Sequence, residues 1–327
     1  MIETVATENT TDKETTEITA PKKLKIVFMG TPDFAVPALK NLIERHNVVA
    51  VFTKEAKPVG RNMVLTKSPV QVVAEEHGIP VHTPHNFKNI LDITKVQMFH
   101  PDMIVVCAYG VILPERILDV PQIGCINIHA SILPRHRGAN PIQRAIMAGD
   151  RMAGVTIMNM NVGVDTGEML LKDAIPVPEN MTYGELENEL SLMGARLILE
   201  YIDNMDNILP QRQTREFTLA PKLAKEEAKI NWEKSAYEIH NLVRALSPHP
   251  YANFTHNDNT IKLIKSELVK GEKTDKPAGS VLNNNLDIAC GDGNILRILS
   301  LQKSGGKILD TKSFLNGYKI EIGEVLK

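Results

Sequence analysis

Residues 124–168 read GCINIHASILPRHRGANPIQRAIMAGDRMAGVTIMNMNVGVDTGE. The run CINIHA alternates apolar and polar side chains, which predicts a strand with Asn127 and His129 on one face near its carboxyl end. A helix is expected to open at Pro141, and VTIMNM predicts the strand that follows it. Asp165 lies just beyond, in VGVDTG. Because an open parallel sheet gathers its loops at the carboxyl edge, we expect Asn127, His129 and Asp165 to face one cleft.

These three side chains favour one kind of chemistry. They supply an amide donor, a titratable imidazole and a carboxylate, but no nucleophile of the protein's own. Ser131 is the nearest hydroxyl, and its neighbours do not form the G-x-S-x-G turn of a nucleophile elbow. Singly, each polar residue is more often a cap or a satisfied hydrogen-bonding group. The long loop SILPRHRGANP favours function, since elaborate loops usually line sites, and the residues suit attack by a substrate's own nucleophile on a polarised carbonyl.

The region before and after this stretch alternates predicted strands with predicted helices. Buried strands are expected in LKIVFMG, VVAVFTK and DMIVVCA, and an amphipathic helix in DFAVPALKNLIERH. Another helix is expected after Ser68, with Pro69 at its first position and Gly78 beyond its end. A capping box at Thr182 and Glu185 opens a longer helix. This order predicts an α/β fold with a Rossmann-type, mostly parallel sheet between layers of helices. The apolar stripe of the longer helix comprises Leu186, Leu190, Met193, Leu197 and Tyr201.

Length and composition predict two domains, because 327 residues with 43% hydrophobic side chains can bury one large core and one small core. Residues 1–22 are acidic and lack an apolar run, so we expect a disordered tail and not a signal peptide. Residues 23–207 are expected to form the first domain, and the aperiodic segment 208–222 a linker. Residues 223–327 begin with a short helix and continue as short strands, ending in KIEIGEVL, which favours a small barrel.

Composition also disfavours several functions. A formal net charge of -2 means that any nucleic-acid contact must be local. Cys107, Cys125 and Cys290 lack metal-ligand or disulfide spacing, so we expect buried thiols in a reducing cytoplasm and no metal. No apolar run reaches membrane-spanning length, and no membrane association is expected. The loop GTPDFA has one glycine where a dinucleotide site needs G-x-G-x-x-G, which argues against a nicotinamide cofactor.

The motifs together resemble a known family. The pattern NIHxSxLPxxRGxxPxQ followed by GxDTG is similar to the signature of formyltransferases that use 10-formyltetrahydrofolate. Further likeness in IVFMGTPDFAVPAL, AYGVILP, AGVTIM, KLAKEEAKINW and PAGSV extends from Leu24 nearly to the C-terminus, and resembles the branch that acts on tRNA. The resemblance implies a monomeric enzyme of translation initiation that formylates the free amino group of methionyl-initiator tRNA. It also implies a formyltransferase domain followed by an OB-like tRNA-binding barrel.

The resemblance assigns residues to this activity. Asn127, His129 and Asp165 match the catalytic positions: Asn127 and His129 would donate to the developing oxyanion, and Asp165 would orient His129 and move a proton from the amine. Position 132 carries Ile132 where leucine is usual, an apolar exchange that should keep the pocket. The folate site that the resemblance implies comprises Tyr109, Gly110, Ser131, Ile132, Leu133 and Pro134.

Residues 54–69, KEAKPVGRNMVLTKSP, correspond to an insertion that contacts the tRNA acceptor stem in the family. Relatives commonly carry a GRGKK-like cluster there, whereas this chain has Met63 and Val64 in place of two lysines. A solvated basic loop is the ordinary alternative. The basic residues of this insertion that the resemblance still implies as tRNA contacts are Lys57, Arg61 and Lys67.

Three functions remain open from the sequence. The tRNA enzyme is favoured by the barrel and by the AKEEAKINW junction. A formyltransferase acting on a sugar nucleotide or purine precursor would share the Asn, His and Asp. A non-catalytic RNA- or folate-binding module is the third, and the complete set of catalytic groups argues against it. Formyl transfer to charged tRNA against small amines separates these functions.

Overall fold

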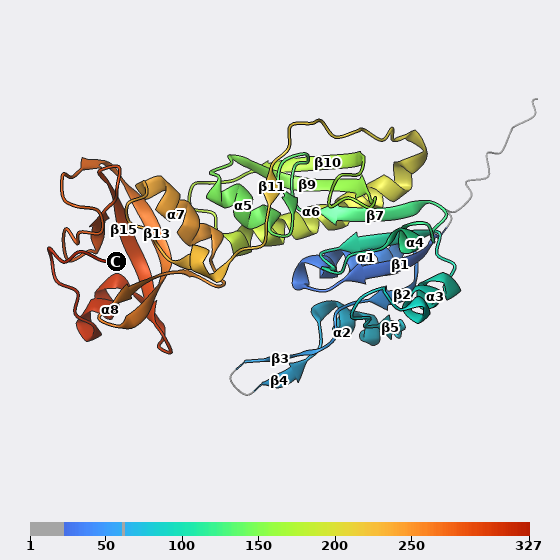
Figure 1. The fold of residues 1–327 in the computed structure, drawn as a ribbon, viewed down its shortest axis with the longest axis horizontal. Coiled ribbons are helices and arrows are strands. Elements are labelled where there is room, and N and C mark those ends of the chain that lie inside the picture. The colour runs from blue at the N-terminus through green and yellow to red at the C-terminus, as the bar shows by residue number, and fades with distance from the viewer. Residues whose placement is uncertain (1–22, 61–62) are drawn as a thin grey trace, which may run out of the picture.

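The structure is a computed structural model that describes residues 23–60 and 63–327 (Figure 1). The expected tail, residues 1–22, and the expected tRNA contact Arg61 lie outside the described residues. A seven-stranded sheet forms the N-terminal part and a five-stranded sheet the C-terminal part. Within the described part of the chain, no helix has the length and apolar character needed to cross a membrane.

The seven-stranded sheet has the order β10-β9-β7-β6-β1-β2-β5. Its strands from β7 to β5 run parallel, while at the other edge β9 is antiparallel to β7 and β10 is antiparallel to β9. The predicted mostly parallel sheet is therefore confirmed. The strands are β1 Lys25–Gly30, β2 Asn47–Phe52, β5 Val81–His82, β6 Met103–Cys107, β7 Gly124–His129, β9 Met152–Asn159 and β10 Met169–Pro176.

Helices cover both faces of this sheet, because its central strands are apolar on both sides. In β1, Ile26 and Phe28 join a core with α1, α2 and α6, whereas Val27 and Met29 join a core with α3 and α4. All four side chains are fully buried. The helices are α1 Val36–Arg45, α2 Pro69–Glu76, α3 Ile90–Met98, α4 Glu115–Leu118, α5 Pro141–Met147 and α6 Tyr183–Asn204, with 3-10 turns η1 Asp33–Ala35, η2 Met205–Asn207 and η3 Lys225–Ala228.

The helix ends follow the sequence signals. The hydroxyl of Ser68 accepts the N–H of Gln71 over 3.0 Å at the start of α2, and Gly78 lies beyond its end with a φ of 66°. Thr182 and Glu185 form the capping box of α6. The predicted apolar stripe of α6 is buried against the sheet core.

The C-terminal sheet has the order β12-β13-β15-β14, with β16 paired to β15. The helix α7 (Ala236–Ala245) packs against β13, and Trp232, Ile239 and Phe254 belong to a separate apolar core. This confirms the predicted C-terminal sheet domain. Its other elements are β12 Ala252–His256, β13 Asn259–Lys273, β14 Asp287–Ala289, β15 Asn294–Lys303, β16 Ile308–Asp310 and α8 Thr311–Gly317.

The predicted last strand, KIEIGEVL, is wrong. The chain makes α8 and then a turn in which the N–H of Glu324 donates to the carbonyl of Glu321 over 3.2 Å. Gly323 adopts a φ of 90° within this turn. Val325 then forms an isolated bridge with Ser280. The turn interrupts the alternation of side chains on which a continuous ladder depends.

A hairpin of β3 (Lys57–Val59) and β4 (Val64–Thr66) projects from the first domain (Figure 1). Its described tip is apolar, since the side chains of Val59, Met63, Val64 and Leu65 are all exposed. A contiguous exposed apolar patch of this kind is typical of a contact surface.

The segment predicted to be a linker, residues 208–222, runs along the first domain. The short strand β11 (Leu219–Ala220) pairs in parallel with β8 (Arg137–Gly138). Gln211 exchanges two main-chain hydrogen bonds of 2.8 Å with Met169. The connection between the two sheets is therefore attached to the first domain at two places before α7 begins.

Candidate functional site

Asn127 and His129 lie at the carboxyl end of β7, between β6 and β9. Asp165 lies in the turn that joins β9 to β10, and its main chain has the left-handed φ of 51°. The structure thus brings together the three residues that the strand pattern placed on one cleft. Because β9 runs antiparallel to β7, Asp165 reaches the other two residues from the turn after β9 and not, as expected, from the end of a parallel strand.

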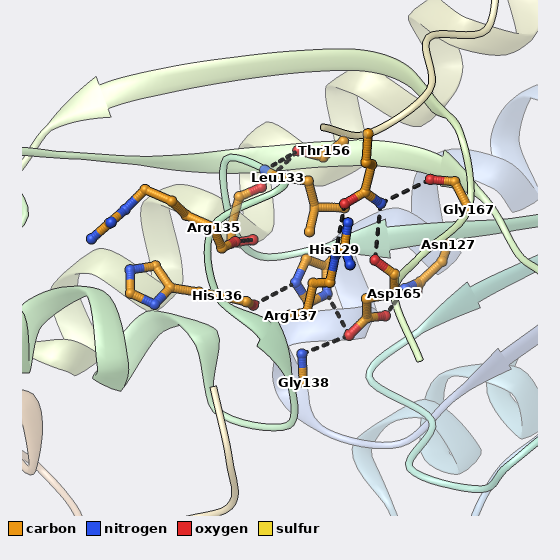
Figure 2. A network of polar contacts seen from close by, with 12 residues as sticks. Asn127, His129, Leu133, Arg135, His136, Arg137, Gly138, Thr156, Asp165 and Gly167 are labelled. Atoms are coloured by element: carbon orange, nitrogen blue, oxygen red, sulfur yellow. Dashed lines mark hydrogen bonds and ion pairs between the residues drawn. The ribbon is translucent and has the colours of Figure 1, made fainter. Parts of the chain in front are cut away.

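The carboxylate of Asp165 is the meeting point of these groups (Figure 2). Its Oδ1 accepts the amide of Asn127 over 3.4 Å, and its Oδ2 accepts the main-chain N–H of Gly138 over 2.8 Å. Nδ1 of His129 lies 3.6 Å from the same Oδ2. The side chains of His129 and Asp165 are 6% and 14% exposed, so their polar groups interact in surroundings of low polarity, more strongly than in water.

The ring of His129 is held on both sides (Figure 2). Its Nε2 lies 3.0 Å from the main-chain carbonyl of His136. Because a carbonyl only accepts, Nε2 carries a hydrogen and Nδ1 is the nitrogen that gains or loses a proton. Nδ1 is thus the ring nitrogen that faces the carboxylate of Asp165.

The hydroxyl of Thr156 on β9 fixes the loop that follows β7 (Figure 2). It donates to the carbonyl of Ser131 over 2.7 Å and accepts the N–H of Leu133 over 3.1 Å. The hydroxyl of Ser131 in turn donates to the carbonyl of Arg135 over 2.7 Å. Ser131 therefore holds the loop in shape, in line with the absence of a nucleophile elbow around it.

The six predicted folate residues do not line one pocket. Gly110 lines a cavity of about 640 Å³, with Phe87, Val111 and Ile112 among its other lining residues. Tyr109, the residue before Gly110, is buried. Its hydroxyl has no hydrogen-bond partner within the described residues, and burial raises the pKa of this hydroxyl.

The other four folate residues lie in the loop after β7. Ser131 and Ile132 line a second cavity of about 310 Å³. Leu133 is buried, in contact with Met158 and Met169, and Pro134 is half-buried. The side chain of Leu133 thus belongs to the packing beneath the site.

The basic residues of the hairpin region are only partly free for tRNA. Lys57 is exposed and lines the 640 Å³ cavity, whereas Lys67 forms an ion pair of 2.7 Å with Glu75. Lys54, which the sequence analysis did not select, also lines this cavity. Burial lowers the pKa of Lys54, and the charges of Lys57 and Lys222 lower it further. A crowded, partly desolvated ammonium group favours an anionic neighbour.

Sequence reasoning missed two residues that complete the site. Gly138 holds the carboxylate of Asp165, and the amide of Gln213 donates to the main-chain carbonyls of Asp165 and Gly167 over 2.9 and 2.8 Å. The RGxxP motif was a signal for Gly138. Gln213 gave none, because it lies in an aperiodic segment and its partners are main-chain atoms.

The class of this protein, formyl transferase, follows from matches of both domains to known families. The family described as formyl transferase matches residues 24–202, and the formyl transferase C-terminal domain matches residues 222–319. The chain belongs to the methionyl-tRNA formyltransferase family. A methionyl-tRNA formyltransferase from Rickettsia felis is 46% identical to it over 305 residues, covering 93% of this chain and 100% of the relative.

Solved structures share the fold. An N-formyltransferase from Helicobacter canadensis, in complex with folinic acid and dTDP-3-aminofucose, has a TM-score of 0.64 at 21% identity, over 86% of this chain and 99% of its own. HypX from Aquifex aeolicus, in complex with tetrahydrofolic acid, has a TM-score of 0.62 at 17% identity, over 94% of this chain and 51% of its own. At these identities the likeness concerns the fold alone.

Proposed function

We propose that this protein transfers the formyl group of 10-formyltetrahydrofolate to the free amino group of methionyl-initiator tRNA, using Asn127, His129 and Asp165. The observation that carries the proposal is the convergence of Asn127, His129 and the N–H of Gly138 on the carboxylate of Asp165. The site offers hydrogen-bond donors and proton carriers without a nucleophile. Direct transfer to a substrate amine needs this combination.

The reaction sets two demands on the site. An α-amino group titrates near pH 8, so a useful fraction is neutral at about pH 7 and its lone pair can attack the formyl carbon. The formyl oxygen then gains negative charge while the attacking nitrogen becomes positive. When the bond from the formyl carbon to the folate nitrogen breaks, the amine loses a proton and the folate nitrogen gains one. The enzyme must stabilise the oxyanion and carry this proton.

We assign oxyanion stabilisation to Asn127. An amide has two N–H groups, and the 3.4 Å contact with Asp165 uses one of them. The other is available to the formyl oxygen as its charge develops. Removal of one such donor typically costs about 2.7 to 4 kcal/mol of transition-state stabilisation.

We assign proton transfer to Asp165 together with His129. The carboxylate accepts the proton of the attacking amine, directly or through water, and Nδ1 of His129 faces it to share the charge. The resemblance to the family suggests that His129 also donates to the oxyanion. The engagement of Nε2 by the His136 carbonyl favours a role toward Asp165 instead.

The 640 Å³ cavity is our candidate for the cosubstrate 10-formyltetrahydrofolate. Its volume lies within the range of about 300 to 1,000 Å³ typical of small-molecule sites. Phe87, Val111 and Ile112 offer apolar contacts to flat rings, and Lys54 and Lys88 offer charge to the glutamate carboxylates. We therefore assign Gly110 to the folate site. We assign Ser131 to Pro134 to the loop that shapes the site around the catalytic residues of β7.

We assign the acceptor arm of the tRNA to the β3–β4 hairpin and to the domain from Leu223 onward. The exposed Lys57 and Lys67 flank the apolar tip of this hairpin. Because the whole chain has a net charge of only -2, phosphate contacts must be few. The affinity for tRNA should therefore fall only gradually as the salt concentration rises.

The proposed function is tested by supplying purified protein with 10-formyltetrahydrofolate and either charged initiator tRNA or dTDP-3-aminofucose. We expect formylated methionyl-tRNA and no formylated sugar. Transfer to the sugar alone would place the protein among enzymes of sugar nucleotides. No turnover with either acceptor would favour a non-catalytic binding protein.

A further inference from the structure

The segment 211–220 lies against the first domain on either side of Gln213. Before Gln213, Gln211 is joined to Met169 by two main-chain hydrogen bonds. After it, β11 pairs with β8. Most side chains between these anchors are exposed, whereas that of Gln213 is half-buried. Gln213 is therefore held over the site by main-chain attachments at both ends.

The amide of Gln213 bridges the turn that carries Asp165. Its Nε2 donates to the carbonyl of Asp165 over 2.9 Å and to the carbonyl of Gly167 over 2.8 Å. Its Oε1 accepts Nε of Arg137 over 2.8 Å, which fixes the orientation of the amide. Both N–H groups of the side chain are used, so the contact has one preferred geometry.

Asp165 needs such support because its φ of 51° is unfavourable for a residue with a side chain. Conformations of this kind persist where the surroundings hold them in place. Gly167 adds to the constraint, since a side chain there would overlap the carbonyl oxygen of Asn159. The two bonds from Gln213 tie the carbonyls at both ends of this short stretch to one side chain.

The carboxylate of Asp165 depends on the same segment by a second route. Its Oδ2 accepts the N–H of Gly138, which lies on β8 beside β11. The approach is close, because a Cβ on Gly138 would lie 2.6 Å from the carbonyl oxygen of Ala220. Both the main chain and the carboxylate of Asp165 are thus fixed by groups that segment 211–220 holds.

We propose that Gln213 is a positioning residue for Asp165, so that this one side chain of the connection between the two domains supports the catalytic site. The inference rests on the proposed function in one respect, the proton-carrying role of Asp165. Gln213 contacts main-chain carbonyls and does not reach the reacting atoms. It acts by setting where the carboxylate lies relative to Asn127 and His129.

The first test compares Gln213→Ala with Gln211→Ala. We expect Gln213→Ala to lower kcat by about 10- to 100-fold, since a misplacement of about 1 Å can cost 100-fold, with both KM values nearly unchanged. Gln211 has an exposed side chain and is joined to Met169 through its main chain, so Gln211→Ala should keep wild-type turnover. Gln213→Glu keeps the oxygen that faces Arg137 but turns a carboxylate oxygen toward the carbonyls of Asp165 and Gly167. Its loss of kcat should be at least as large as that of Gln213→Ala.

The second test separates positioning from a general structural role. In an Asp165→Asn background, Gln213→Ala should cause no further loss of kcat, because the group that it positions is already disabled. An equal fold-loss in both backgrounds would overturn the proposal.

Hydrogen exchange at the amide of Gly138 provides a measurement that needs no turnover. In Gln213→Ala it should be faster than in the wild type at an unchanged unfolding midpoint, because its acceptor Asp165 is less well held. Unchanged exchange would also overturn the inference. If the wild type formylates no tRNA, the proposed function fails on that assay, while this exchange measurement still decides the placement of Asp165.

Discussion

Nδ1 of His129 lies 3.6 Å from Oδ2 of Asp165, while the opposite ring nitrogen is bound to a main-chain carbonyl. The imidazole therefore has one nitrogen available for proton exchange, and that nitrogen faces the carboxylate. His129 and Asp165 therefore face each other through this one contact. The loss of one partner should disable the other.

Asp165→Asn should lower kcat by about 10²- to 10⁴-fold, the usual contribution of general acid-base catalysis, because an amide cannot take the amine proton. Asn127→Ala and His129→Ala should also lower turnover strongly. The losses should not add when the changes are combined, since the groups act as a unit. Asp206→Asn, at an exposed acid on η2, is the matched control in the tRNA formylation assay. A folded Asp165→Asn or His129→Ala protein with full turnover would exclude the mechanism.

Ile112→Asp should weaken the use of 10-formyltetrahydrofolate more than tRNA affinity, because it puts a carboxylate among the apolar groups of the 640 Å³ cavity. Ile112 is 86% exposed, so the change should leave the fold intact. Leu133→Asp would bury the charge among Met158 and Met169 and should lower stability instead. Separate titrations of folate and tRNA, with a thermal melt of each variant, check this. Unchanged folate affinity in Ile112→Asp would move the cosubstrate elsewhere.

Gly167→Ala should reduce turnover by displacing the turn of Asp165, because its Cβ would overlap the carbonyl oxygen of Asn159. The change should also destabilise the protein by about 1 to 3 kcal/mol, the usual penalty for overpacking. Gly317→Ala is the control, since a Cβ there meets no atom within 4 Å. Turnover and urea unfolding of both variants provide the test. Wild-type activity of Gly167→Ala would show that the turn tolerates movement.

Glu227 should stabilise the protein in a pH-dependent way. Its carboxylate accepts Arg144 of α5 over 2.6 and 2.9 Å and the N–H of Ala224, and these bonds hold its pKa below the ordinary 4.5. A carboxyl group whose pKa is lower in the folded protein than in the unfolded chain stabilises the fold at pH values above its unfolded pKa. This stabilisation is lost as the pH falls through the folded pKa. Glu227→Gln should thus be less stable than the wild type at about pH 7, by a modest amount because the pair is partly exposed, and should match it in acid.

Urea midpoints at neutral and acid pH measure this difference. The exposed neighbour Glu226 provides the control Glu226→Gln, which should follow the wild type at both pH values. If Glu227→Gln loses the same amount of stability at neutral and acid pH, the ionised carboxylate of Glu227 is not the source of the stabilisation.

Leu65→Ser should raise the KM for charged tRNA and leave folate use unchanged, because it removes an apolar contact at the exposed tip of the β3–β4 hairpin. Arg61→Ala should act in the same direction, since the guanidinium can pair with phosphate or a base edge. The control is Leu91→Ser, an equally exposed leucine on α3. Steady-state kinetics with both substrates decide between the outcomes. A wild-type KM for tRNA in Leu65→Ser and Arg61→Ala would remove the hairpin from recognition.

The sequence was sufficient for the parts of the fold that depend on local patterns. Buried strands such as β1 and β6 are continuous apolar runs, and the caps at Ser68 and Thr182 carry the side chains that satisfy free N–H groups. The prediction that Asn127, His129 and Asp165 lie together is met, although β9, which precedes Asp165, runs antiparallel to β7 and not parallel as the prediction assumed. The turn at Gly323 was not predicted, because KIEIGEVL alternates like a strand and its turn is fixed by contacts with residues distant in sequence.

The site was less accessible to prediction than the sheet. Gln213 acts through hydrogen bonds to main-chain atoms, which leave no pattern of side-chain types. The placement of Leu133 in the packing beneath the site depends on which way the loop turns after β7. Cavities formed by separate loops, such as the one shared by Lys54 and Gly110, depend on tertiary arrangement.

The pairing of β11 with β8 determines where hybrid enzymes can be joined. A chain cut after Asn207 would lose both Gln213 and β11, so its inactivity would say nothing about tRNA recognition. A junction placed after Pro221 would keep the parallel pair and exchange the C-terminal domain alone. Relatives that formylate other amines could donate that half. The catalytic half that accepts it must bring its own connecting segment.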